Sequence, residues 1–227
     1  MEFYVDIADI EEVRKVADYF PIDGFTTNPN ILTKSEKSLC ENFREYRDFC
    51  RETGCRLFVQ VTAEDAEGMY RQAKELKAYF GENLVVKLPA VREGYKALRL
   101  CKKDGLEICV TVVHSPTQAL IAAKGGADYI APYVSHIDNI GADGVRCVGE
   151  MVDLISRYGY RSKVLGASFR TADQIERLAG VGCQAVTVTP QFFDLLIAHP
   201  STNESMEMFG NAWKSKFGDS QVTEGCR

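Results

Sequence analysis

The chain repeats one pattern eight times: a short apolar run is followed by a longer stretch in which apolar residues recur with helical spacing. The apolar runs are rich in Val, Ile and Leu, which is typical of strands in a parallel sheet that is covered on both faces. The 227 residues contain no linker and no low-complexity segment, and they match the size of one α/β barrel. The pattern therefore predicts a single-domain (β/α)₈ barrel of the α/β class.

The apolar runs set the expected strands, and capping residues set the expected helix starts. Strands are expected at residues 2–7, 24–27, 56–62, 84–89, 107–113, 129–134, 162–167 and 184–189. Helices are expected at about 9–20, 36–51, 65–80, 91–103, 115–125, 171–180, 190–198 and 201–217, with one more ending near 158. Asp9 with Glu12, and Thr171 with Gln174, are predicted to form capping boxes at two of the helix starts.

An open, doubly wound sheet is the alternative architecture for such a chain. No expected strand is followed by the Gly-x-Gly-x-x-Gly turn that opens many such sheets, and this favours the closed barrel. Residues 1–198 are assigned to the barrel, and residues 199–227 to an extra amphipathic helix and a tail. The large apolar residues of that extra helix are Met206, Phe209, Trp213 and Phe217.

Charge, cysteine and histidine content argue against several other classes of protein. With 27 Lys and Arg against 32 Asp and Glu, the net charge of -5 provides no basic surface for nucleic acid or an anionic membrane. No apolar run approaches the roughly 18 residues of a membrane span, and the first residues lack the features of a signal peptide, so a cytoplasmic protein is expected. The eight cysteines and three histidines show no zinc-binding spacing, so reduced thiols and no metal are expected.

A lysine stands inside the fourth apolar run. Lys87 lies between Val86 and Leu88, and a buried ammonium loses its hydration unless it is paired or becomes neutral. A neutral amine is a nucleophile that attacks carbonyl carbons and forms a Schiff base. The alternative interpretation is that Lys87 lies at a strand end and extends its ammonium into water.

Polar residues also stand at the ends of the other expected strands. In a barrel of this kind the site forms where the carboxyl ends of the strands meet. Each residue alone is also compatible with ordinary turn chemistry. Together they offer an amine, a carboxylate, a phenol, hydroxyl groups and a cation, which are the groups that a Schiff-base aldolase needs. They are Asp6, Thr26, Asn28, Gln60, Thr62, Lys87, Thr111, Tyr133, Ser168, Arg170, Thr187 and Thr189.

Four short motifs carry a resemblance to a known family. They are Thr26-Thr27-Asn28-Pro29, Val85-Val86-Lys87-Leu88-Pro89, Ala131-Pro132-Tyr133-Val134 and Ala167-Ser168-Phe169-Arg170. With these motifs the chain resembles the transaldolase family over residues 2–218, and within it the small fructose-6-phosphate aldolase branch. The resemblance implies a (β/α)₈ barrel in which Lys87 forms an imine with a ketose, without a metal or an organic cofactor. Cleavage then releases an aldehyde and leaves a dihydroxyacetone enamine on the lysine.

The resemblance also implies roles for the other site residues and for the extra helix. Asp6 and Asn28, with Thr26 in the same motif, match positions that bind the dihydroxyacetone fragment. Thr111 matches the residue that holds the catalytic water, and Ser168 and Arg170 match part of a phosphate site. The C-terminal helix is expected to pack on a neighbouring subunit of a homo-oligomer, a pentamer or a decamer. The expected partner is a small sugar or sugar phosphate, not nucleic acid or a membrane.

Three positions bear on the reaction subtype. Gln60 and Tyr133 match the aldolase branch, which the chain resembles here, whereas transaldolases carry a glutamate and a phenylalanine at these two positions. A phenol near the lysine can protonate the enamine, so these residues favour free aldol release over transfer, and transaldolase is the alternative. His136 replaces an arginine of the family pattern, and the terminal group of the substrate therefore stays open between phosphate, sulfonate and none. A barrel that binds a sugar derivative without turnover is the third hypothesis, which Lys87 and Asp6 oppose.

Overall fold

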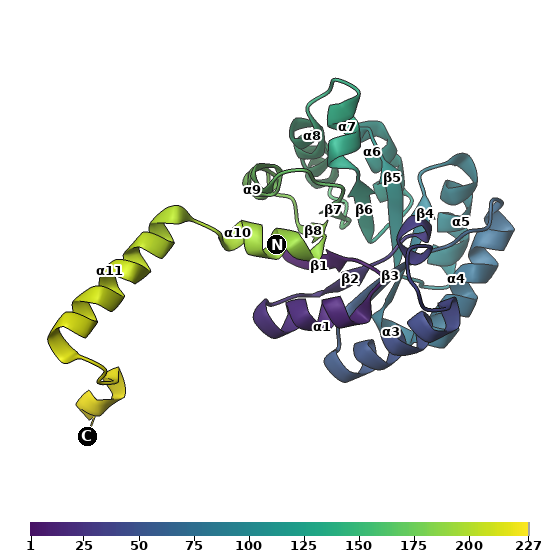
Figure 1. Cartoon of the computed structure of the whole chain (residues 1–227). Helices are drawn as coiled ribbons and strands as arrows, with labels where there is room; N and C mark the ends of the chain where they lie inside the picture. The colour runs from purple at the N-terminus through teal and green to yellow at the C-terminus, as the bar shows by residue number, and fades with distance from the viewer. Residues whose placement is uncertain (227) are drawn as a thin grey trace. The chain divides into compact units, whose positions relative to one another are not determined.

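The computed structural model describes residues 1–226 and confirms the predicted (β/α)₈ barrel. Eight parallel strands pair in chain order, and β1 also pairs with β8, so the sheet is closed. Figure 1 shows the strands enclosed by the helices that connect them. The strands are β1 (Glu2–Asp6), β2 (Gly24–Thr26), β3 (Arg56–Gln60), β4 (Leu84–Pro89), β5 (Ile108–Val113), β6 (Tyr129–Pro132), β7 (Lys163–Gly166) and β8 (Ala185–Val188).

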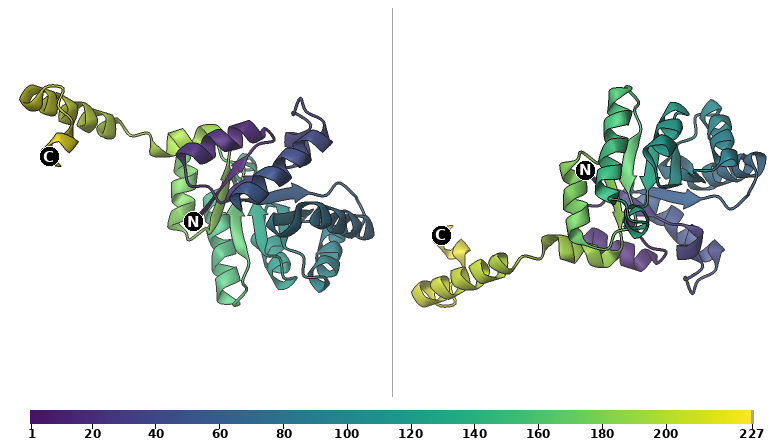
Figure 2. Two further views of the ribbon diagram at one scale, coloured as in Figure 1. Left: turned by 90° about the horizontal axis from the view of Figure 1, so that it is seen from below. Right: turned by 90° about the horizontal axis from the view of Figure 1, so that it is seen from above.

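Most helices lie where the sequence predicts them, and Figure 2 shows them around the outside of the strands from two further directions. The helices of the barrel are α1 (Ile10–Tyr19), α3 (Leu39–Thr53), α4 (Ala66–Phe80), α5 (Arg92–Lys103), α6 (Pro116–Lys124), α8 (Gly144–Arg157), α9 (Ala172–Gly180) and the start of α10 (Pro190–Ile197). Two short helices were not predicted, α2 (Pro29–Leu32) and α7 (Val134–Asn139). Short 3-10 turns cover Gly81–Asn83 and Val222–Cys226.

The capping residues give mixed results. The predicted capping box of Thr171 and Gln174 forms at the start of α9. The predicted box at α1 is wrong: Asp9 accepts a hydrogen bond from the Glu11 backbone, while the Glu12 carboxylate pairs with Lys15 at 2.6 Å. The ion pair draws Glu12 forward along the helix, so it does not reach back to the cap.

The interior of the barrel changes from apolar to polar along the strand direction. Its apolar layer is made by Tyr4, Phe58, Val85, Cys109, Tyr129, Ala131, Leu165 and Ala185. Within it the rings of Tyr4 and Phe58 lie 4.9 Å apart and those of Phe58 and Tyr129 lie 5.1 Å apart, both edge to face. Side chains two residues apart on a strand share a face, so the next inward positions are polar. These are Asp6, Gln60, Lys87, Thr111 and Thr187.

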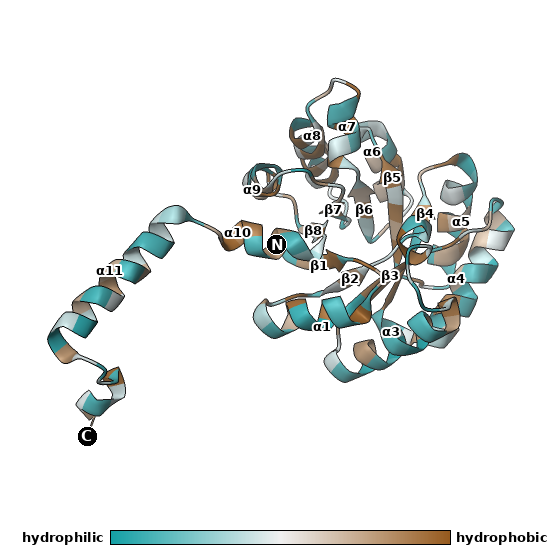
Figure 3. Cartoon of the chain, viewed as in Figure 1, coloured by the Kyte–Doolittle hydropathy of each residue, from teal (hydrophilic) through white to brown (hydrophobic). Residues whose placement is uncertain are grey.

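The outer surfaces of the strands carry the apolar side chains on which the helices pack. Figure 3 shows the strands as the most hydrophobic part of the barrel and the outward sides of the helices as hydrophilic. Val86, Leu88 and Val110, for example, are almost entirely buried. Among residues 1–226, no helix combines the length and the hydrophobicity that crossing a bilayer requires.

The contacts within the chain divide it into two compact units, Met1–Phe193 and Asp194–Arg227. The sequence places the corresponding boundary at residue 198, between α10 and α11 (Pro200–Phe217). No residue of α11 is buried, and its apolar side chains are exposed; they include Met206, Phe209, Trp213 and Phe217. Their packing on a neighbouring subunit stays a prediction.

Gly94 allows α5 to approach the end of β4. A Cβ atom at this position would lie 1.9 Å from the carbonyl oxygen of Pro89, which cannot move without displacing the strand that carries Lys87. We expect Gly94→Ala to lower the free energy of unfolding by about 1–3 kcal/mol or more, as overpacking does.

Gly180→Ala is the matched control, because a Cβ atom there meets nothing within 4 Å. This variant is expected to leave the stability unchanged or to raise it by up to about 1 kcal/mol, since alanine favours helix. Urea unfolding followed by circular dichroism measures both variants. Equal stability of Gly94→Ala and the wild-type protein would contradict the close approach.

Candidate active site

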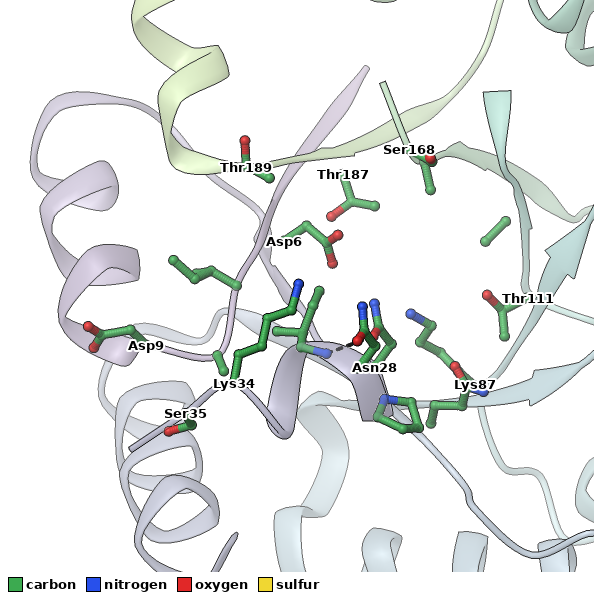
Figure 4. Close-up of a pocket in the computed structure, with 18 of the residues that line it drawn as sticks. Asp6, Asp9, Asn28, Lys34, Ser35, Lys87, Thr111, Ser168, Thr187 and Thr189 are labelled. Atoms are coloured by element: carbon green, nitrogen blue, oxygen red, sulfur yellow. Dashed lines mark hydrogen bonds between the residues drawn. The ribbon is translucent and has the colours of Figure 1, made fainter. Parts of the chain in front are cut away.

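A cavity of about 1150 Å³ opens where the carboxyl ends of the strands meet. Figure 4 shows side chains from several strands converging on it. Of the ten residues for which the resemblance implies a role, eight line this cavity: Asp6, Asn28, Gln60, Lys87, Thr111, Tyr133, His136 and Ser168. Thr26 and Arg170 do not line it. Closure of the barrel thus brings most of the predicted strand ends to one place.

Lys87 is buried at the bottom of the cavity, with 5% of its surface exposed. Its ammonium donates a hydrogen bond of 2.8 Å to the backbone carbonyl of Thr27, and it forms no ion pair among the described residues. The interpretation in which this ammonium extends into bulk water is therefore wrong. On β5, Cys109 stands in register with Lys87, and burial raises the pKa of its thiol to about 12. The thiol thus stays neutral beside the lysine.

Asp6 is held by a short chain of hydroxyl groups. The Thr26 hydroxyl donates to the Asp6 carboxylate at 2.6 Å, which leaves the Thr187 hydroxyl to donate to Thr26, also at 2.6 Å. Burial raises the pKa of the Asp6 carboxyl, while the charge of Lys87 and the hydrogen bond from Thr26 act in the opposite direction. Thr26 thus acts on the cavity through Asp6, because its own side chain is fully buried behind it.

Asn28 combines a structural contact with a place at the cavity wall. Its side-chain oxygen accepts a hydrogen bond of 2.9 Å from the Ile31 backbone and so caps α2, as the dashed line in Figure 4 marks. Pro29 then occupies the first position of the helix, where its missing N–H costs nothing. Because the oxygen is used by the cap, the amide nitrogen is the donor that Asn28 can offer to a ligand.

Tyr133 and Thr111 lie next to each other in the cavity lining. The Thr111 hydroxyl donates to the Tyr133 hydroxyl over a long distance of 3.5 Å, so the phenol retains its own proton for another acceptor. Tyr133 directly precedes α7, where Val134 donates to the carbonyl of Ala167 and ends the strand earlier than predicted. The arrangement leaves a phenol donor at the edge of the cavity.

Two residues at the cavity have backbone φ angles that side-chain-bearing residues rarely adopt. Val112 and Ser168 both have φ of 61°, and both line the cavity. At Val112 the pairing of β5 with β6 shifts by one residue, which is a β-bulge. For a β-branched residue this conformation is strained, and such strain collects at functional sites.

The turn at Ser168 separates the two predicted anion-binding residues. The Ser168 hydroxyl stays at the cavity and lies 2.7 Å from that of Ser135. Arg170 is exposed, and its backbone N–H donates to the Gln174 side chain at the start of α9. The positive φ of Ser168 turns the chain outward before Arg170 is reached, and a spacing pattern does not reveal such a turn.

Two histidines surround Tyr133, and the sequence singled out only one of them. The His114 and His136 rings are stacked with centroids 5.8 Å apart, and Tyr133 lies edge-on to them at 5.7 Å and 5.1 Å. Burial lowers the pKa of His114, and the neighbouring His136 adds to this effect. His114 follows directly after the fifth strand, so the same strand-end argument that found Tyr133 also applies to it.

The loop after α2 supplies part of the wall that sequence reasoning missed. Lys34, Ser35, Glu36 and Lys37 line the cavity from this loop. Figure 4 shows the Lys34 side chain extending from the loop toward the cavity interior. Its position depends on the short helix α2, which the sequence did not predict. Among residues 1–226, no group of three or more His, Cys, Asp or Glu side chains is arranged to hold a metal ion.

Comparison with known proteins identifies the chain's relatives. A family model described as transaldolase/fructose-6-phosphate aldolase matches residues 3–224. A mandelate oxidase mutant with an FMN monooxide adduct is similar with a TM-score of 0.56 and 16% identity over 83% of this chain, which spans 64% of that enzyme's chain. A thiamine phosphate pyrophosphorylase from Pyrococcus furiosus gives a TM-score of 0.59 and 16% identity, over 83% of this chain and 85% of that chain. At such low identity the two structures show the shared fold alone.

The raised pKa of Asp6 predicts a pH-dependent cost to folding. The folded protein holds the Asp6 proton more tightly than the unfolded chain, so this stabilising contribution is complete below the ordinary pKa of 3.8 and is lost as pH rises through the folded-state pKa. Asparagine does not titrate. We therefore expect the stability of Asp6→Asn to increase relative to the wild type as pH rises, by about 1.4 kcal/mol for each pH unit between the unfolded-state and the folded-state pKa.

Urea unfolding at a series of pH values between about 4 and 8 measures this difference. Asp18→Asn is the matched control, since it removes a carboxylate whose side chain is exposed. A stability difference between Asp6→Asn and the wild type that is the same at every pH would show that burial does not hold the Asp6 proton.

Proposed function

Because the chain belongs to the transaldolase/fructose-6-phosphate aldolase family, whose members are enzymes of carbon–carbon bond chemistry, we propose that it is a Schiff-base aldolase acting through Lys87. The observation that carries the proposal is the burial of Lys87 at the bottom of a polar cavity, where its only hydrogen-bond acceptor among residues 1–226 is the neutral carbonyl of Thr27. Such an amine is placed to meet a carbonyl carbon instead of a counter-ion. The proposed substrates are ketoses such as fructose 6-phosphate.

In the proposed first step, neutral Lys87 attacks the ketose carbonyl and forms a carbinolamine, which loses water to give the imine. The carbonyl oxygen leaves as water, so it must receive protons from groups within the cavity. We assign this role to the Thr111 hydroxyl and the Tyr133 phenol, whose oxygens lie 3.5 Å apart at the cavity. The apolar layer below Lys87 closes the cavity from beneath.

In the proposed second step, the bond between C3 and C4 of the ketose breaks. Its electron pair moves into the protonated imine to form a neutral enamine, while the C4 hydroxyl loses its proton and becomes the carbonyl of the released aldehyde. Asp6 is suited to accept this proton, because burial raises the pKa of its carboxyl. The hydroxyls of Thr26 and Thr187 hold the carboxylate in place for that task.

The fate of the enamine distinguishes an aldolase from a transaldolase. A proton delivered to the enamine carbon, followed by hydrolysis of the imine, releases free dihydroxyacetone. Tyr133 keeps a phenol proton for this purpose, because it accepts its hydrogen bond from Thr111. We therefore favour aldol release, and transfer of the same unit to a second aldehyde is the runner-up. Ser168 and His136 line the same cavity, and we assign them to the far end of the substrate.

Borohydride reduction in the presence of dihydroxyacetone tests the imine. We expect a stable adduct on Lys87, located by peptide mass spectrometry, and no adduct in Lys87→Ala. The same variant should release aldehyde at least about 10³-fold more slowly, since it lacks the covalent nucleophile. An adduct of equal yield in Lys87→Ala would refute the assignment. Saturable sugar binding without any adduct in the wild type would instead favour a barrel that binds without turnover.

The phenol is tested by Tyr133→Phe, which keeps the ring and removes the hydroxyl. Release of free dihydroxyacetone should fall by about 10²- to 10⁴-fold, the usual contribution of a general acid, while transfer to erythrose 4-phosphate should persist. Both products are measured from the same fructose 6-phosphate reaction. Unchanged release in this variant would remove the argument that favours an aldolase over a transaldolase.

A further inference from the structure

The pairing of β5 with β6 skips one residue near the end of β5. Thr111 pairs with Ala131, and the next pair is Val113 with Pro132. Val112, which is skipped, forms the bulge and has the φ of 61° that a valine rarely adopts. The reaction steps proposed above do not explain why the chain accepts this strain.

The bulge places His114 beside Tyr133. A regular register would continue one residue at a time and put Val113 next to Tyr133. With the bulge, the Tyr133 N–H donates to the Val113 carbonyl at 3.1 Å, and the following residue, His114, lies beside the phenol. The centroids of the His114 and Tyr133 rings are 5.7 Å apart, with the rings edge to face. The strained residue thus brings an aromatic ring to the phenol, where a regular strand would bring a valine.

The backbone of His114 is held from two sides. Its N–H donates to the Gln118 side-chain oxygen at 2.8 Å, and the same oxygen accepts from Ser115 in the capping box of α6. The Cys147 thiol, on α8, donates to the His114 carbonyl at 3.8 Å. Burial lowers the pKa of the imidazole, which favours its neutral form. A neutral ring with a fixed backbone therefore packs on Tyr133.

Few other contacts fix the phenol. Among residues 1–226, the hydroxyl of Tyr133 has one hydrogen bond, the long one of 3.5 Å from Thr111. The exposed His136 ring also packs on Tyr133, but it belongs to α7, which Tyr133 itself caps. His114 follows directly after β5, the strand that carries Thr111 and pairs with the strand of Lys87. Its ring therefore fixes the phenol relative to a different strand.

We propose that His114 is a positioning residue, which holds the Tyr133 phenol beside Thr111 so that it can protonate the enamine. This inference rests on the proposed function, in which Tyr133 supplies that proton. His114 does not line the cavity, so it acts on the substrate through the phenol. In the supported step the phenol gives its proton to the enamine carbon, which yields a protonated imine and a phenolate. The phenolate then regains a proton from water.

Two measurements with dihydroxyacetone separate imine formation from the proton step. Borohydride trapping on Lys87 gives the half-saturating concentration of dihydroxyacetone for the imine. Exchange of its carbon-bound hydrogen in D₂O, followed by NMR, reports the proton step. The imine carbon passes a proton to the phenolate of Tyr133, which gives the enamine and a phenol, and the phenol returns a deuteron after it has exchanged with the solvent.

We expect His114→Ala to lower the exchange rate by about 10- to 100-fold, since a misplaced reacting group slows a reaction strongly. The half-saturating concentration for trapping should stay within about twofold, because Lys87 keeps its position. His114→Phe keeps a flat ring against the phenol and should restore the exchange rate to within about threefold of the wild type. A purely structural role of His114 would not separate the two measurements in this way.

Cys147→Ala is the matched control, because it removes the thiol that donates to His114 and leaves both rings in place. Its exchange rate should equal that of the wild type. An unchanged rate in His114→Ala, an equal loss in Cys147→Ala or no recovery in His114→Phe would each overturn the inference alone. No adduct in the wild type would instead refute the Schiff-base chemistry, and unchanged exchange in Tyr133→Phe would refute proton transfer from the phenol. The inference would be lost with either.

Discussion

Pairing of β1 with β8 closes the sheet, and closure makes the inward side chains of eight strands face one another. Because side chains alternate along each strand, every second residue enters the interior and the interior is built in layers. Tyr4, Phe58 and Tyr129 pack edge to face in the lower layer and keep water away from beneath Lys87. The polar layer stands directly above. A slip of one residue in any strand would turn its inward side chains outward and its outward side chains inward.

The end of β2 connects the two groups that matter most to the proposed chemistry. The hydroxyl of Thr26 donates to Asp6, and the carbonyl of the next residue, Thr27, accepts from Lys87. Thr27 is itself tied to β3, since its hydroxyl and its N–H both donate to the carbonyl of Phe58. A carboxyl and an amine from different strands are therefore positioned by one dipeptide. Their spacing follows from the backbone of β2 more than from direct contact between them.

Periodicity and composition were sufficient to predict the barrel and the strand ends that reach the cavity. Lys87 and Asp6 were predicted because polar residues within apolar strands are rare unless they have a function. This argument requires no knowledge of the loops. Arg170 was expected at the cavity and lies outside its lining, because the positive φ of Ser168 turns the chain before it. Such a backbone angle at a serine is imposed by tertiary contacts, which local sequence does not record.

Lys34 is the opposite case: it lines the cavity, but the sequence did not predict it there. A lysine after a short polar segment reads as an ordinary surface residue, and only α2 and the buried Asn42 bring it to the cavity wall. His114 was missed although it directly follows β5, at a strand end like Tyr133. Its ring packs against that of Tyr133 with centroids 5.7 Å apart, and it does not line the cavity.

The two short helices α2 and α7 bring residues to the cavity wall that do not belong to the strands. Both follow strand ends: α7 carries the wall residue His136, and Lys34 comes after α2. Lys87 and Asp6 are held by strand backbone and by neighbouring strands, so replacing either segment leaves them in register. Residues of these two segments can therefore be replaced while Lys87 and Asp6 keep their positions at the cavity.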